Sequence, residues 1–182
     1  WSPPLRSSMR MVLNREKHPF YKHSDAAFYI AEEDAKVLGR VMVLDNRHYN
    51  TFNETSIGFI YYFDAVNRED VAVGLFAAAE AWVMSQGKLR RAASKGMMRA
   101  DPYGVLVEGF EYTAALSMPY NYAYYADLMT AAGFTKQIDY VSGSMPGDHE
   151  LPTGRRAALQ SSCPAGQGRR RLQAEKGHHS RT

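Results

Sequence analysis

Residues 55–87 read TSIGFIYYFDAVNREDVAVGLFAAAEAWVMSQG, and this stretch decides the fold. Residues 55–63 are rich in aromatic and β-branched side chains and are apolar on both faces, which predicts a strand in the middle of a sheet. Apolar side chains then recur with helical spacing as far as Gly87, a residue type that commonly ends helices. The stretch therefore predicts a central strand followed by a packed helix, as in an α/β domain.

The start of this helix carries a capping signal. Asn67 stands where an N-cap residue would, and Asp70 follows three residues later, which is the spacing of a capping box. Apolar side chains occupy most of the helix circumference, so we expect the helix to be deeply packed.

Two more strands are expected before the central one. Residues 26–31 and 37–44 are rich in strand-forming side chains and are separated by the polar residues 32–36, which predicts a β-hairpin. Residues 45–54 contain three asparagines and a histidine and are expected to form a loop. Together with the central strand, the hairpin predicts an antiparallel meander.

Downstream of the helix, residues 89–94 predict a fourth strand. This strand should run parallel to the third, because a helix crosses between them. Glycine and proline interrupt residues 95–118, where we expect a long loop with a short ordered piece. Residues 119–132 predict a second helix, and residues 134–141 predict a final strand.

Both ends of the chain differ from this body. Residues 1–17 are expected to form an arm or a short helix, and the chain reads as one begun in mid-sequence and incomplete at both ends. Residues 18–145 form the expected domain. Residues 146–182 contain only three residues of the types Leu, Ile, Val and Phe, which predicts a disordered tail because so few apolar groups cannot offset the entropy of ordering.

Two other interpretations of the tail stay open. Arg169, Arg170 and Arg171 could form a basic arm that contacts nucleic acid or a membrane. The abrupt change of composition after Pro152 also fits an out-of-frame translation that replaced a proper C-terminal half.

The charge of the chain is divided unevenly. Seven of its 22 basic and three of its 19 acidic residues lie in residues 146–182, so residues 1–145 keep 15 basic and 16 acidic residues. The body is therefore nearly neutral, and nucleic acid is not an expected partner for it. No apolar stretch approaches the ~20 residues of a membrane span, and the single cysteine, Cys163, makes a cytoplasmic setting the default expectation.

The order of these elements resembles the GCN5-related N-acetyltransferase (GNAT) superfamily. Leu38-Gly39-Arg40-Val41 is similar to the third strand of that fold, and residues 125–134 are similar to its last helix and the Gly-Phe that follows. Further phrases are similar to a bacterial GNAT-like group without an assigned substrate: residues 1–5 (WSPPL), 18–21 (HPFY), 106–110 (LVEGF) and 119–125 (PYNYAYY). The resemblance implies a mixed α/β sheet with the acyl-CoA N-acyltransferase fold.

The resemblance also implies a site for the co-substrate, acetyl-CoA or another acyl-CoA. The family binds its pyrophosphate at the start of the helix after the central strand, through the pattern Arg/Gln-x-x-Gly-x-Gly/Ala, and free N–H groups at a helix start suit an anion. Asn67-Arg68-Glu69-Asp70-Val71-Ala72 aligns with this pattern; Ala72 matches it, whereas Asp70 replaces a glycine. The expected cofactor-binding residues are Phe63, Asp64, Asn67, Arg68, Asp70, Val71 and Ala72.

The catalytic residues are left open by the sequence. Many members place a tyrosine four residues before the Gly of Gly-Phe to protonate the leaving thiolate, and here that position is Met129. Tyr124 and Tyr125 could replace it, but aromatics on a helix face favour buried packing as their role. Glu108 could act as a base, and a solvated loop carboxylate is the alternative. Asp64, at the end of the central strand, lies where α/β folds often place ligand groups, and the same alternative applies to it.

The resemblance thus implies an acyl-CoA-dependent N-acyltransferase acting on a small-molecule or peptide amine by direct attack on the thioester. The acidic Asp70 and the missing tyrosine at Met129 favour an alternative, a non-catalytic GNAT-like module that binds a ligand or another domain. His18 and His23 do not have the spacing of metal ligands, so no metal is expected.

Overall fold

The computed structural model describes residues 5–98, 101–114 and 118–143. The chain divides into two units, Trp1–Tyr140 and Val141–Thr182, and the fold below is that of the first. The tail at residues 146–182, with its three arginines and Cys163, lies outside the described residues, and so do the expectations that concern it.

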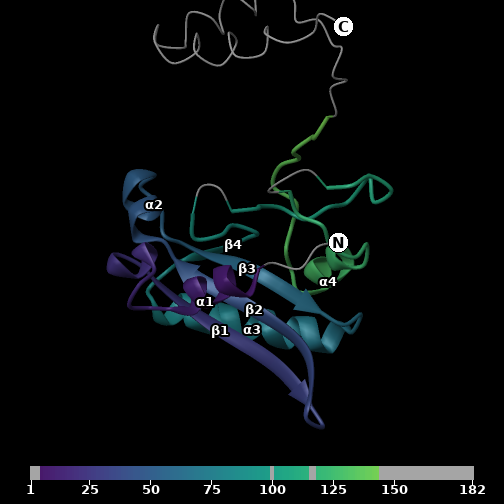
Figure 1. Ribbon diagram of the computed structural model, residues 1–182, viewed down its shortest axis with the longest axis horizontal. Coiled ribbons are helices and arrows are strands. Elements are labelled where there is room, and N and C mark those ends of the chain that lie inside the picture. The colour runs from purple at the N-terminus through teal and green to yellow at the C-terminus, as the bar shows by residue number, and fades with distance from the viewer. Residues whose placement is uncertain (1–4, 99–100, 115–117, 144–182) are drawn as a thin grey trace, which may run out of the picture. The chain divides into compact units, whose positions relative to one another are not determined.

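Four strands form one mixed sheet, shown in Figure 1. They are β1 (Asp25–Glu33), β2 (Lys36–Asp45), β3 (Ile57–Ala65) and β4 (Arg90–Ala93), in the spatial order β1-β2-β3-β4. The first three strands pair antiparallel, whereas β3 and β4 pair parallel. The predicted hairpin, central strand and parallel fourth strand are confirmed, and the chain is of the mixed α/β class.

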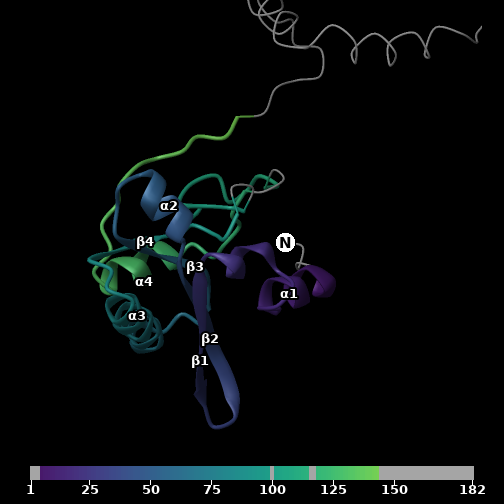
Figure 2. The same cartoon turned by 90° about the vertical axis from the view of Figure 1, so that its left-hand side faces the viewer.

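The helices of the described residues are α1 (Arg6–Leu13), the 3₁₀ helix η1 (Pro19–Lys22), α2 (Arg47–Phe52), α3 (Glu69–Ser85) and α4 (Tyr125–Ala131). Figure 2 shows the sheet nearly edge-on, with α3 against one face and α1 on the opposite side. The short helix expected near the N-terminus is confirmed as α1. No helix in the described part of the chain is long and apolar enough to span a membrane.

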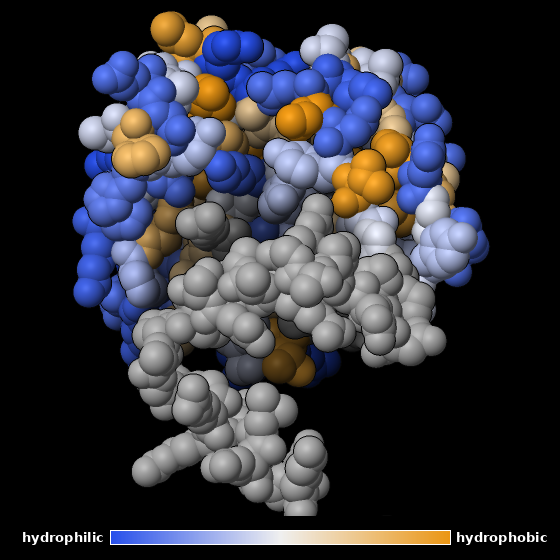
Figure 3. Space-filling view, turned by 90° about the horizontal axis from the view of Figure 1, so that it is seen from above, coloured by the Kyte–Doolittle hydropathy of each residue, from blue (hydrophilic) through white to orange (hydrophobic). Residues whose placement is uncertain are grey.

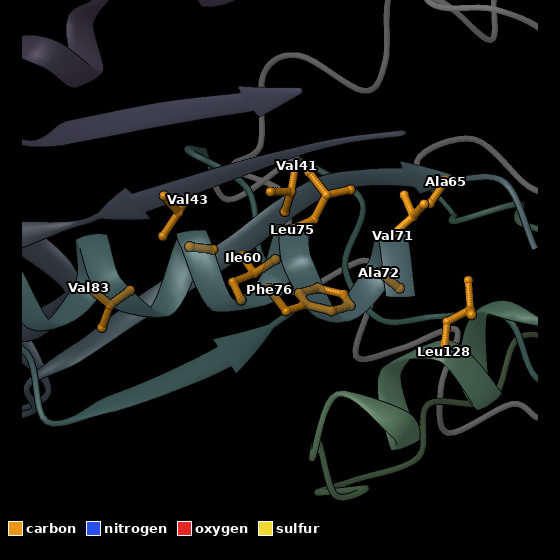
Figure 4. Close-up of a cluster of buried hydrophobic side chains, with 11 residues drawn as sticks. Val41, Val43, Ile60, Ala65, Val71, Ala72, Leu75, Phe76, Val83 and Leu128 are labelled. Carbon is orange, nitrogen blue, oxygen red and sulfur yellow. The ribbon is translucent and has the colours of Figure 1, made fainter. Parts of the chain in front are cut away.

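The main core lies between α3 and the sheet, as Figure 4 shows. Phe76 on α3 is almost completely buried against side chains that include Val41 and Ile60. The close approach of helix and sheet depends on Gly58, because a Cβ atom there would collide with the side chain of Val83. A second cluster on the other face packs Phe20 and Met97 against side chains of β1, β2 and β3.

The helix α3 is deeply packed on the side that faces the sheet, as expected, whereas its outward side is open. Val73 is 39% exposed and Met84 is 68% exposed. The sheet covers only one face of the helix, and α4 has only seven residues with which to cover more. Small side chains rather than complete burial explain why the sequence of α3 is apolar all round.

The expected loop at 45–54 contains α2 instead. The side chain of Asn46 accepts a hydrogen bond from the N–H of Tyr49 and caps this helix. Asn50 is buried, and its amide group donates to Asp45 and to the carbonyl of Ile57. The asparagines that predicted a loop therefore cap and anchor a short helix.

The last two predicted elements are shorter than expected or not formed. The helix predicted at 119–132 is α4 only, because the side chain of Asn121 pairs with both backbone groups of Leu106 and holds the preceding segment in an irregular conformation. Within the described residues, 134–141 do not form a strand. Phe134 packs on Phe76, but Ile138 stays 63% exposed, so the segment lacks a buried face.

Candidate functional site

The carboxyl end of β3 extends beyond its parallel neighbour. The parallel pairing begins at Ile57 and ends at the pair Ile60–Ala93, whereas β3 continues to Ala65. Residues 61–65 therefore pair with β2 on one side and have no ladder partner from β4 on the other. This end of β3, which extends beyond β4, lies close in sequence to the start of α3.

Two tyrosines at the start of α4 are hydrogen-bonded to this end of β3. The Tyr125 hydroxyl donates to Oδ1 of Asp64 at 2.5 Å and accepts from the N–H of Ala65 at 3.4 Å. The Tyr124 hydroxyl donates to the carbonyl of Ala65 at 2.9 Å. Both backbone groups of Ala65 are thus bound by tyrosines rather than by a fourth strand.

Asp64 is the accessible carboxylate of this cluster. Its side chain is 53% exposed, and its Oδ2 lies 3.4 Å from Nη2 of Arg40, the residue opposite it on β2. Arg40 and Tyr125 therefore hold the carboxylate from two sides while leaving part of it open. A carboxylate in this setting can bind an ammonium group or accept a proton from one.

Burial raises the pKa of the Tyr125 hydroxyl, and the hydrogen bond to Asp64 and the charge of that carboxylate raise it further. Burial likewise raises the pKa of Tyr124, with smaller contributions from Tyr122 and Asp64. Both hydroxyls therefore remain protonated and act as hydrogen-bond donors over the physiological pH range.

The raised pKa of Tyr125 predicts a loss of stability in alkali. Its contribution is fully present below pH of about 10, where the unfolded tyrosine is still neutral, and is lost as pH rises toward the higher folded pKa. At neutral pH, Tyr125→Phe should lower the free energy of unfolding by about 1 kcal/mol, the typical value of one hydrogen bond. Urea unfolding of both proteins at pH values from neutral to strongly alkaline should show this difference shrinking above pH of about 10; a constant difference would contradict the assignment.

The start of α3 differs from the predicted capping box. The N-cap residue is Arg68, and its side chain makes no capping hydrogen bond. Asn67 is exposed, one residue too early to cap. Asp70 instead binds the Arg68 side chain, through Nε at 3.1 Å and Nη2 at 2.5 Å. The carboxylate of Asp70 pairs with the guanidinium of Arg68 and not with the backbone N–H of Asn67, so the expectation of a capping box is wrong.

Arg68 also binds a second carboxylate, from the hairpin. Its Nη1 lies 2.6 Å from Oε2 of Glu33, at the end of β1, and its Nη2 lies 3.3 Å from Oε1. The hydrogen bonds and charge of Arg68 lower the pKa of Glu33, and the same two effects lead in lowering that of Asp70. The cation expected to bind a pyrophosphate is thus shared by two ionised carboxylates.

The other expected cofactor-binding residues, Phe63, Val71 and Ala72, pack their side chains in or against the main core. Phe63 stacks on Phe76 at 4.5 Å between ring centroids and lies 5.2 Å from the Tyr125 ring. The side chains of Val71 and Ala72 are buried in the main core. Val71 also lines, together with Asp70, a pocket between β1 and α3.

Two further candidates lie apart from the Asp64 cluster. Met129 packs against the main core, which explains an apolar residue at that position. Glu108 is exposed in an irregular segment, and no hydrogen bond or ion pair joins it to Asp64 in the described part of the chain. Within the same part, no group of three or more His, Cys, Asp and Glu side chains could hold a metal ion.

On the face seen from above in Figure 3, the described residues form no patch that is uniformly hydrophobic or uniformly hydrophilic. Figure 3 shows hydrophobic residues scattered among hydrophilic ones over the described part of this face.

Comparison with known proteins gives two relatives. The chain is similar to Protein YghO of Escherichia coli (strain K12). The identity is 28% over 143 residues, covering 78% of this chain and 36% of that protein. Bacterial ceramide synthase of Caulobacter vibrioides (strain NA1000 / CB15N) is 21% identical over 169 residues, covering 91% of this chain and 44% of the relative. The chain thus spans less than half the length of these curated relatives.

No family model and no solved structure matches the chain. The membership of a family is therefore not shown, and the resemblance drawn from the sequence remains a proposal. Of these two relatives, only the ceramide synthase has a name that states a reaction.

Two partners in this cluster were missed from the sequence. Arg40 and Glu33 both lie on the hairpin, far in sequence from the residues they bind. The register of β2 and β3 shifts by one residue between Arg40 and Met42, so the pairing of Met42 with Tyr61 alone would have placed Arg40 opposite Phe63 rather than Asp64. No local signal identifies Glu33, since the contact depends on how the hairpin end reaches the start of α3.

Proposed function

We propose that this chain forms the acyl-CoA-binding part of an N-acyltransferase of the GNAT type. One observation carries the proposal: β3 continues to Ala65 beyond the end of β4 at Ala93, so that residues 61–65 have no β4 partner, close in sequence to the start of a long helix. The carboxyl ends of strands are common ligand sites in open α/β folds. In this proposal, the acyl thioester lies along residues 61–65, and the pyrophosphate lies near Arg68.

The name of one relative supports the reaction class. A ceramide is an amide of a long-chain amine and a fatty acid, so a protein named ceramide synthase forms an N-acyl bond. By analogy with that relative, the proposed acceptor is a primary amine, either of a small molecule or of a peptide, and the proposed donor is acetyl-CoA or a longer acyl-CoA.

Asp64 is the residue to which we assign the central chemical role. Its carboxylate accepts a proton from the acceptor ammonium, and the neutral nitrogen attacks the thioester carbonyl. The new C–N bond forms as the C–S bond breaks, and coenzyme A leaves as a thiol after its sulfur takes a proton from the Tyr124 hydroxyl. The second proton of the attacking nitrogen passes to the Tyr124 oxygen, which restores the hydroxyl and leaves a neutral amide. Arg40 and Tyr125 position the carboxylate through the contacts described above.

The arrangement around Arg68 favours a second candidate function. Two carboxylates on one guanidinium leave the start of α3 with a local net negative charge, which opposes an anionic ligand. Under this alternative, the chain is a non-catalytic GNAT-like module that binds a neutral or cationic ligand, or another protein.

Calorimetry and an amine-dependent assay of thiol release separate the two candidates. We expect the intact chain to bind at least one acyl-CoA of an acetyl-to-palmitoyl series and to release coenzyme A only when a primary amine is present. Binding without amine-dependent release would refute the catalytic role alone, and the absence of both would refute the proposal and favour the module that binds a neutral or cationic ligand or another protein.

A further inference from the structure

We propose that Glu33 acts as a latch on Arg68, which an incoming diphosphate must displace. The inference rests on the proposed function, because it assumes that the pyrophosphate of an acyl-CoA lies near Arg68. It adds a regulatory step that the proposed function does not contain. In this step, the Glu33 carboxylate of the β1–β2 hairpin competes with the ligand for the guanidinium of Arg68.

The geometry of Arg68 leaves little donor capacity for a ligand. A guanidinium carries five N–H donors, and its Nε, Nη1 and Nη2 atoms all lie within hydrogen-bond distance of Glu33 or Asp70. A phosphate binds arginine best through two parallel hydrogen bonds. Such a pair requires at least one carboxylate to leave.

Glu33 is the carboxylate able to leave. Asp70 is only two residues from Arg68 and is also stabilised by backbone N–H groups of the first turn of α3. Glu33 comes from a different element and is 55% exposed. In the hairpin register Glu33 lies opposite Lys36. When Glu33 separates from Arg68, the ammonium group of Lys36 is therefore available as a partner on the neighbouring strand.

Release of Glu33 would also free the end of the hairpin from the start of α3. The turn itself is fixed, because Asp34 and Ala35 both adopt positive φ angles, as a tight two-residue turn requires. The ion pair is exposed, and its strength falls with added salt. The Glu33–Arg68 ion pair maintains a contact between β1 and α3, and it is reversible and screened by salt. Ligand binding is therefore coupled to the loss of this contact.

The test compares Glu33→Gln with Glu32→Gln in the intact chain. Both substitutions remove one negative charge from adjacent exposed positions, but only Glu33 binds Arg68 in the described structure. Calorimetry with acetyl-CoA, and separately with inorganic pyrophosphate, should show about two- to fivefold tighter binding for Glu33→Gln than for Glu32→Gln, as expected for one exposed ion pair. Arg68→Ala should remove the difference between them.

The possible outcomes separate the latch from the proposed function. Equal affinities of Glu33→Gln and Glu32→Gln for acetyl-CoA would overturn the latch and leave the proposed function standing. Tighter binding of both probes to Glu33→Gln, without acyl transfer to any amine, would support the latch and overturn the enzyme. If neither the natural chain nor Glu33→Gln bound either probe, both proposals would be refuted.

Discussion

Replacing Phe76 with alanine is expected to lower the free energy of unfolding by about 3–5 kcal/mol, the usual cost of truncating a buried phenylalanine. Phe76 is 1% exposed and is the largest of the fully buried side chains. Its ring contacts Phe63 and Phe134, so it joins the central strand, α3 and the segment after α4. The cavity left by alanine would be lined by well-packed groups that cannot close over it.

Urea unfolding of the intact chain, followed by circular dichroism, measures this loss. Met84→Ala is the matched control, because Met84 lies on the same helix but is 68% exposed. The control should change stability by no more than about 0.5 kcal/mol. Equal effects of the two substitutions would show that α3 does not pack against the sheet as described.

Replacing Asp64 with asparagine is expected to reduce kcat/KM for acyl transfer by about 100- to 10,000-fold, the usual contribution of a general base. The amide keeps the size of the side chain but cannot accept the proton of the acceptor amine. Since Asp64 is half exposed, the fold should survive the substitution. The loss should appear mainly in kcat, with acyl-CoA affinity nearly unchanged.

Asp127→Asn is the control for this second experiment. Asp127 is an exposed carboxylate in the first turn of α4, close in sequence to Tyr125, with no ion pair among the described residues. We expect the control to keep activity within about twofold. If Asp64→Asn were equally active, another group would have to take the proton, and the role assigned to Asp64 would be wrong.

The sheet and the long helix could be predicted because their signals are local. Residues 55–63 and the apolar repeat of α3 each identify an element within one continuous segment, and a crossing helix then makes the fourth strand parallel. The same argument placed Asp64 at the end of the central strand, where the structure has it.

The side-chain partners could not be predicted because they depend on contacts between distant segments. Arg68 was expected to face a phosphate, and the hairpin carboxylate that binds it lies 35 residues earlier in the chain. The Tyr125 hydroxyl hydrogen-bonds the end of β3, 60 residues earlier in the chain, a contact that the helical pattern of residues 119–132 does not indicate. Both differences follow from tertiary contacts that no periodic pattern in the sequence records.

Hydrogen exchange of the intact chain with and without acyl-CoA tests the central claim most directly, because it locates the ligand without assuming any residue's role. The proposed site predicts slower exchange confined to peptides that cover residues 61–72, the end of β3 and the start of α3. Saturating acyl-CoA that left the exchange of these peptides unchanged, or that protected only other segments, would contradict an acyl-CoA site at this end of the sheet.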